Sequence, residues 1–139
     1  MSGKVFVDSN ILIYAHDKDA GTKQRQAAER LKKLWDTQLG LLSTQVLQEF
    51  YVNVTRKIKK PLRSDLAREV VRNYGLWVES PITPATVVRA SEIGEIWRLS
   101  FWDSMILAAA EQDGAGELLT EDLHSGQKIA GIRVVNPFL

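Results

Sequence analysis

Apolar and polar positions along the chain follow two different periods, and their alternation predicts strands followed by helices. Val5–Val7 is a run of consecutive apolar residues that ends at Asp8, as expected of a short strand covered on both faces. The apolar pattern resumes over residues 11–14 as a short helical stretch. From residue 22 to residue 35, apolar positions recur at helical spacing among Lys, Arg and Gln, which predicts an amphipathic helix.

The same alternation continues to the end of the chain. Residues 41–42 predict a minimal strand, and Ser43 or Thr44 then caps a helix whose apolar stripe keeps the helical period until Pro61. The remaining predicted elements are a helix over 64–74, a strand over 76–78, a helix from Pro84 to about residue 98, a buried helix around 105–110, and strands over 118–120 and 132–135. This order predicts a three-layer α/β/α sandwich with a central parallel sheet and right-handed crossovers.

The composition fits one globular domain over residues 1–139, because 45% of the residues are hydrophobic and 25% are charged. Eighteen Lys and Arg against 17 Asp and Glu give a net charge of +1, so a basic binding site must be local. The absence of cysteine excludes disulfide scaffolds, cysteine-ligated metals and thiol catalysis, and it fits a reducing compartment. Neither a membrane span nor a signal-peptide pattern is recognisable, so we expect a cytoplasmic protein without a membrane partner.

Four acidic residues interrupt apolar segments where a parallel sheet would place a functional crevice, at the carboxyl ends of its strands. Asp8 ends the first strand, and Asp122 follows the strand over 118–120. Glu49 lies at the edge of an apolar helix face, and Asp103 lies at the start of the buried helix. Each has a structural alternative, because Asp8 is a favoured helix cap, Asp103 completes a capping-box pattern, and the other two suit solvated positions.

The four acids together favour a cation site. A like-charge pair at about 4 Å costs about 4 kcal/mol at an effective dielectric constant near 20, and a divalent cation removes that cost. Ligation by carboxylate oxygens, without cysteine, selects Mg²⁺ or Mn²⁺ over zinc. His16 and His124 do not form a ligand spacing, so we expect them at the surface or behind the ligands.

These residues, in order, give the chain a family resemblance. The motifs are Val-Phe-Val-Asp8-Ser-Asn10, Glu49 within an apolar helix, Ser-Phe-Trp-Asp103-Ser-Met-Ile-Leu, and Leu-Leu-Thr120-Glu-Asp122. The series spans nearly the whole chain and resembles a PIN domain. A single PIN domain of this length further resembles the VapC toxin of bacterial and archaeal VapBC toxin–antitoxin pairs.

The resemblance implies an endoribonuclease that depends on Mg²⁺ or Mn²⁺. Its catalytic and metal-binding acids would be Asp8, Glu49, Asp103 and Asp122, with Asn10 (or Ser9) and Thr120 as polar supports. Glu121 stands beside the fourth acid, and the Thr-x-Asp register favours Asp122 over it. The implied partners are an RNA substrate, a cognate antitoxin and a second copy of the chain in a homodimer.

Two further features bear on binding. The segment from Arg56 to Arg63 carries five cations in eight residues, which suits contact with RNA phosphates or a partner but equally a solvated helix end. The aromatic residues that could stack on unpaired bases, or else belong to the core or an interface, are Tyr14, Tyr51, Trp97, Phe101 and Trp102.

Other functions remain open from the residues alone. A haloacid-dehalogenase-type phosphatase also begins with a strand ending in Asp, but it needs a second Asp where this chain has Asn10. A response-regulator receiver needs paired acids after the first strand, and here Asp8 stands alone. A PIN-fold protein that binds or processes RNA outside a toxin–antitoxin pair is the main alternative to a toxin.

Overall fold

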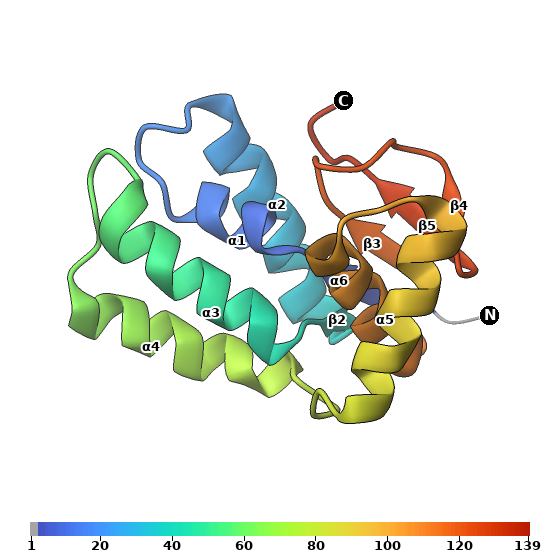
Figure 1. Cartoon of the computed structure of the whole chain (residues 1–139). Coiled ribbons are helices and arrows are strands. Elements are labelled where there is room, and N and C mark those ends of the chain that lie inside the picture. Colours follow the sequence, from blue (N-terminus) through green and yellow to red (C-terminus); the bar gives the residue numbers. More distant parts are fainter. Residues whose placement is uncertain (1–2) are drawn as a thin grey trace.

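The computed structural model describes residues 3–139 and places a five-stranded sheet at the centre of the molecule (Figure 1). Its strands are β1 (Val5–Val7), β2 (Gly40–Leu41), β3 (Glu117–Leu119), β4 (Lys128–Ile129) and β5 (Ile132–Val135). They lie in the order β2-β1-β3-β5-β4, and all neighbours are parallel except β4 and β5. The order brings β1 and β3, which are distant in sequence, side by side.

The helices form two groups. They are α1 (Ser9–Ala15), α2 (Thr22–Thr37), α3 (Thr44–Val52), α4 (Ser64–Tyr74), α5 (Pro84–Trp97) and α6 (Phe101–Gln112), with a π turn η1 (Asn53–Lys57) and a 3₁₀ turn η2 (Gly75–Trp77). Helices α1 to α4 gather on one side of Figure 1, whereas α5 and α6 pack together beside β3 and β5. The predicted α/β sandwich with a central, mostly parallel sheet is confirmed.

The core follows the apolar pattern of the sequence. Phe6, Val7, Leu118 and Leu119 of the two central strands are fully buried, which explains their runs of consecutive apolar residues. Residues 104–110 of α6 are also buried on every face, as the all-round apolar pattern predicts. The site residues at the strand ends therefore stand on a rigid base.

The predicted helix starts are present in the structure. Ser43 caps α3 by accepting a hydrogen bond from the backbone N–H of Val46, and Ser100 caps α6 by accepting one from the N–H of Asp103. Thr83 forms a capping box with Thr86 at the start of α5, where Pro84 occupies the first turn. These caps fix where α3 and α6 begin, and hence where Glu49 and Asp103 lie.

The predicted strand over 76–78 is wrong. The chain forms the 3₁₀ turn η2 there, and Val78 makes only an isolated bridge to Leu42. The reason is the side chain of Trp77, which is 6% exposed and lies flat against Gly40, where an added Cβ would come within 2.8 Å of its ring. Burying the indole determines the backbone path more strongly than the short apolar run does.

The helix predicted up to Pro61 also changes form before it ends. Regular α3 stops at Val52, and the π turn η1 follows, in which the N–H of Ile58 bonds to the carbonyl of Asn53. The side-chain amide of Asn53 donates a 2.8 Å hydrogen bond to the carbonyl oxygen of Glu49.

Strand β4 was not expected, because two residues carry too little pattern to be recognised. No helix among residues 3–139 is both long enough and apolar enough to cross a bilayer.

Candidate active site

Asp8 is both a helix cap and a candidate site residue, because its two carboxylate oxygens have different partners. One carboxylate oxygen, Oδ1, caps α1 by accepting a 2.7 Å hydrogen bond from the N–H of Ser9. The other, Oδ2, accepts a 2.8 Å hydrogen bond from the hydroxyl of Thr120 and a 3.4 Å bond from the amide of Asn10. Capping of α1 uses only Oδ1. Oδ2 is oriented instead by Asn10, near the start of the chain, and by Thr120, near its end.

The environment of Asp8 disfavours its negative charge. The side chain is 6% exposed, and burial raises its pKa from 3.8 to about 7. Hydrogen bonds from Thr120 and Ser9 act in the opposite direction, whereas the neighbouring charges of Asp122 and Glu49 raise the pKa further. The side chains around Asp8 therefore supply too little positive charge to stabilise its ionised carboxylate at neutral pH.

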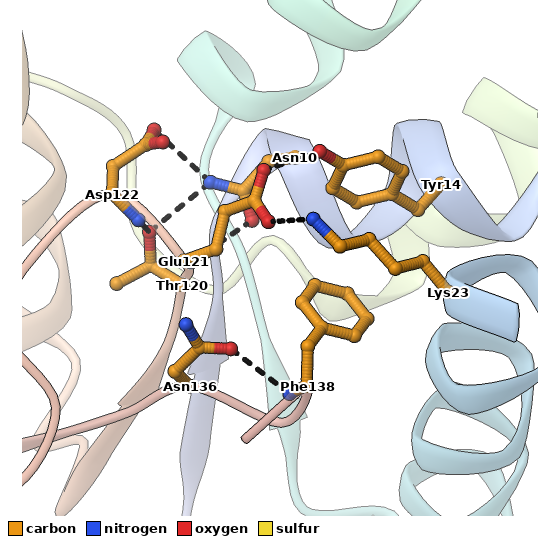
Figure 2. Close-up of polar contacts among 8 residues, drawn as sticks. All are labelled: Asn10, Tyr14, Lys23, Thr120, Glu121, Asp122, Asn136 and Phe138. Atoms are coloured by element: carbon orange, nitrogen blue, oxygen red, sulfur yellow. Dashed lines mark hydrogen bonds and ion pairs between the residues drawn. The ribbon is translucent and has the colours of Figure 1, made fainter. Parts of the chain in front are cut away.

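Asn10, Thr120 and Asp122 form a hydrogen-bonded group (Figure 2), and Asn10 and Thr120 also contact Asp8. The Asn10 amide donates to the Thr120 hydroxyl and to Asp122 Oδ2, both at 3.1 Å. The backbone N–H of Asp122 in turn donates to the Thr120 hydroxyl at 3.1 Å. The group arises because β1 and β3 are parallel neighbours, so residues just beyond their carboxyl ends meet.

Glu49 and Asp103 approach from the helices. The buried amide of Gln45 on α3 lies 3.5 Å from the Glu49 carboxylate and 3.3 Å from the carbonyl oxygen of Trp102, the residue before Asp103. The structure thus brings Asp8, Glu49 and Asp122 within electrostatic range and connects the Asp103 segment through Gln45. Asp103 itself is half-buried in the first turn of α6 and is not one of the charges that shift the pKa of Asp8.

These donors suit a divalent metal ion in their chemistry. Within residues 3–139, no three Asp, Glu or His side chains already converge on a common point at metal-ligand distance. The oxygens nearby come from carboxylates, an amide and a hydroxyl, which is the ligand set that Mg²⁺ and Mn²⁺ prefer. The buried Asp8 carboxylate, with its raised pKa, indicates that a cation would relieve an unfavourable arrangement of charge.

Glu121 turns away from this group, as Figure 2 shows. Its carboxylate accepts hydrogen bonds from the hydroxyl of Tyr14 and, at 2.8 Å, from the ammonium group of Lys23. Burial disfavours its charge, but the bonds from Lys23 and Tyr14 outweigh burial and lower its pKa. The structure thus separates the two adjacent acids, and Asp122 is the one beside Asn10 and Thr120.

The sequence did not identify Lys23 and Tyr14 as neighbours of the site. The sequence places Lys23 only among the polar positions of an amphipathic helix, and Tyr14 among the aromatic residues that either stack on bases or belong to the core or an interface. Their shared partner, Glu121, lies 98 and 107 positions further along the chain, so no local pattern connects them to it. His16 lies against Phe50, with Nδ1 2.9 Å from the carbonyl of Leu12. His124 is exposed.

The basic run lies beyond α3, in η1 and the loop before α4. Within it, Lys60 pairs with Asp19 at 3.8 Å and Arg63 pairs with Asp65 at 2.9 Å. Its other exposed cations are Arg56, Lys57 and Lys59.

Near Asp103, Trp102 is 64% exposed, so an apolar surface borders the acidic residues.

Comparison with known proteins places these features in context. A family model described as PIN domain matches residues 5–128 of the chain. No curated protein sequence is significantly similar to it.

Several solved structures share the fold at low sequence identity. A toxin–antitoxin complex from Klebsiella pneumoniae superposes with a TM-score of 0.68 at 20% identity, covering 96% of this chain and 98% of the other. VapBC2 from Rickettsia felis, bound to a DNA fragment from its promoter, gives 0.62 at 16% identity over 94% and 96%. VapC20 from Mycobacterium tuberculosis, described as a toxin that cleaves the sarcin–ricin loop, gives 0.62 at 17% identity over 94% and 99%.

Proposed function

Because the chain belongs to the PIN domain family, we propose that it is a metal-dependent endoribonuclease that acts as the toxin of a toxin–antitoxin pair. The observation that carries the proposal is the buried Asp8 carboxylate, whose pKa is raised by burial and by the nearby charges of Asp122 and Glu49. A buried carboxylate whose pKa is raised in this way is typical of a functional site. The similarity to toxins of known structure supports the biological role.

Asp8, Glu49, Asp103 and Asp122 would hold the cation, Mg²⁺ or Mn²⁺. When bound, the cation supplies positive charge to the phosphate and lowers the pKa of water. Thr120 and Asn10 orient the carboxylates, because their hydrogen bonds fix Asp8 Oδ2 and Asp122 Oδ2.

The remaining chemistry falls to the carboxylates themselves. Hydrolysis of a phosphodiester requires the attacking water to lose a proton, and a half-buried Glu49 beside Asp8 is placed to accept it. We therefore assign Glu49 both ligand and base functions and need no side-chain nucleophile.

RNA would approach over the exposed cations of the basic run. Arg56, Lys57 and Lys59 are the members of the run outside its two ion pairs, and phosphate contacts are made by such exposed Lys and Arg side chains. We propose that these cations hold the RNA backbone while the acids cut it. Because RNA is its proposed substrate, we propose the cytoplasm as the location of the protein.

We propose the groove between α3 and α4 as the antitoxin site. This groove has a volume of about 500 Å³ and is lined by Leu47, Tyr51, Val71, Arg68 and Arg72, among others. Apolar walls with two arginines suit a segment with apolar and acidic side chains, as a cognate antitoxin would supply.

A homodimer would use a different face. Large apolar side chains are exposed on α5 and at the start of α6, where Val88, Ile96 and Trp102 are each at least 60% exposed. Exposed apolar surface of this kind marks an interaction site. Trp102→Asp should shift the protein to a monomer in sedimentation analysis, and a dimer that persists would place the interface elsewhere.

The central test is cleavage of RNA by acid-to-amide variants. Asp8→Asn and Asp103→Asn should lose at least about a hundredfold in cleavage rate at saturating Mg²⁺, a loss typical of metal-site disruption. Asp36→Asn, an exposed acid on α2, is the matched control and should cut normally. Cleavage that survives EDTA, or that is normal in both site variants, would refute the proposal.

A further inference from the structure

Lys23 occupies an unusual position for a lysine. It lies in the first turn of α2, and that turn contains no acidic residue. A positive charge at the start of a helix opposes the helix dipole. Its ammonium group nevertheless is fixed, 2.8 Å from Glu121 and within 5.3 Å of the ring centres of Tyr14 and Phe138. Contacts outside α2 therefore explain where this side chain lies.

The aromatic rings around Lys23 are themselves held in place. Tyr14 and Phe138 meet edge to face with their centres 5.3 Å apart. The backbone N–H of Phe138 donates a 2.9 Å hydrogen bond to the side-chain carbonyl of Asn136, which fixes the turn near the end of the chain (Figure 2). The Lys23 ammonium group thus lies against rings from α1 and the C-terminal turn, although its side chain remains 43% exposed.

Glu121 transmits this anchoring to the candidate active site. Its side chain is held by Tyr14 and Lys23, while its backbone N–H faces the side-chain oxygen of Asn10 at 3.4 Å. The amide of the same Asn10 donates to Asp122 Oδ2 and to the Thr120 hydroxyl. Moving Glu121 would therefore move the segment 120–122 relative to Asp8.

We propose that Lys23 and Tyr14 act through Glu121 as positioning residues, which hold the segment 120–122 so that Asp122 faces the cation site while Glu121 is kept out of it. The inference rests on the proposed function in taking Asp122 as a metal ligand. It adds a specific arrangement of two adjacent acids, in which Asp122 binds the cation and Glu121 is neutralised by Lys23.

The test measures Mn²⁺ affinity of the full chain by calorimetry for Lys23→Gln, Glu121→Gln and the double variant. Positioning predicts that each single variant binds Mn²⁺ about tenfold more weakly, at the lower end of losses for residues behind metal ligands. The double variant should be no weaker than the singles, because Lys23 acts only through Glu121. Lys23→Arg should restore affinity, and Lys33→Gln, an exposed lysine on the same helix, should leave it unchanged.

The opposite result has a distinct meaning. If Glu121 is a metal ligand that Lys23 holds back, Lys23→Gln will free it and tighten Mn²⁺ binding, which would overturn the proposal. Unchanged affinity in both single variants would overturn it too, since the ion pair would then be only a surface contact.

A second measurement separates this inference from the proposed function. In metal-free protein, Lys23→Gln should speed hydrogen exchange at the N–H groups of Glu121 and Asp122, which bond to Asn10 and Thr120. A wild-type chain that binds no Mn²⁺ would refute the metal site, and exchange rates would still decide the positioning role. Exchange at the same rate as in wild type would refute that role.

Discussion

Replacing Asp8 by Asn should stabilise the metal-free protein at pH 8. The substitution keeps the shape of the side chain and an oxygen that accepts the N–H of Ser9, but it removes a buried negative charge. Burial and the neighbouring acids raise the pKa of Asp8 from 3.8 to about 7. Each pKa unit corresponds to about 1.4 kcal/mol, so the ionised carboxylate destabilises the folded state by about 4 kcal/mol as an upper limit.

Part of that gain is lost in the variant. The new amide N–H₂ replaces Oδ2, which accepts the hydroxyl of Thr120 and the amide of Asn10, and it meets these donors with a donor of its own. Such a mismatch costs about 1–3 kcal/mol. The expected net increase in the free energy of unfolding at pH 8 is about 2 kcal/mol.

The pH dependence has a definite sign. Since the folded pKa of Asp8 lies above its ordinary value, the folded protein binds this proton more tightly than the unfolded chain does between about pH 4 and pH 7. The Asp8 contribution to wild-type stability is therefore present in full below about pH 4 and is lost as the pH rises to about 7. The variant lacks this loss, so its advantage should grow from pH 4 to pH 8.

Urea denaturation in EDTA at pH 5 and pH 8 measures this difference. Saturating Mn²⁺ should reverse the order at pH 8, because the wild type alone keeps the full set of carboxylates. A variant that is less stable than wild type at pH 8 in EDTA, or an advantage that does not change with pH, would refute the electrostatic reasoning.

Three other substitutions test further parts of the structure. Charge reversal of Arg56, Lys57 and Lys59 to Glu should weaken RNA binding and flatten its salt dependence by about 0.7 in log–log slope per lost phosphate contact, without changing Mn²⁺ affinity; an unchanged slope would leave the run as a solvated surface. Gln45→Ala should lower the free energy of unfolding by about 0.5–1.5 kcal/mol in urea, because it removes the hydrogen bond from the Gln45 amide to the carbonyl of Trp102, and Gln48→Ala, at an exposed site, should not. Gly40→Ala should cost about 1–3 kcal/mol by forcing Trp77 to shift, whereas Gly75→Ala, with open space around it, should be neutral or stabilising; equal effects would contradict the close contact.

The parts of the site that the sequence predicts are those fixed by the sheet. Asp8 and Thr120 follow apolar strands, and parallel strands bring their carboxyl ends together whatever the rest of the chain does. The pairing of Lys23 with Glu121 depends instead on how α2 lies against the loop after β3. No local pattern carries that information.

The predicted elements that were wrong have the same origin. The segment 76–78 has a strand-like composition, but its path is determined by the packing of Trp77 against Gly40, Trp35 and Tyr74. Tertiary packing of one large side chain thus overrode a local preference of three residues.

The hydrogen bonds that join Asn10 to Thr120 and Asp122 span 110 and 112 positions of a 139-residue chain. Contacts so distant in sequence form late in folding, because a long loop must close before they stabilise anything. A nascent chain of which only the residues up to 119 have left the ribosome has Asp8 but neither Thr120 nor Asp122. The order of synthesis alone therefore keeps the candidate active site incomplete until residues 120–122 have left the ribosome, whether or not an inhibitor is already present.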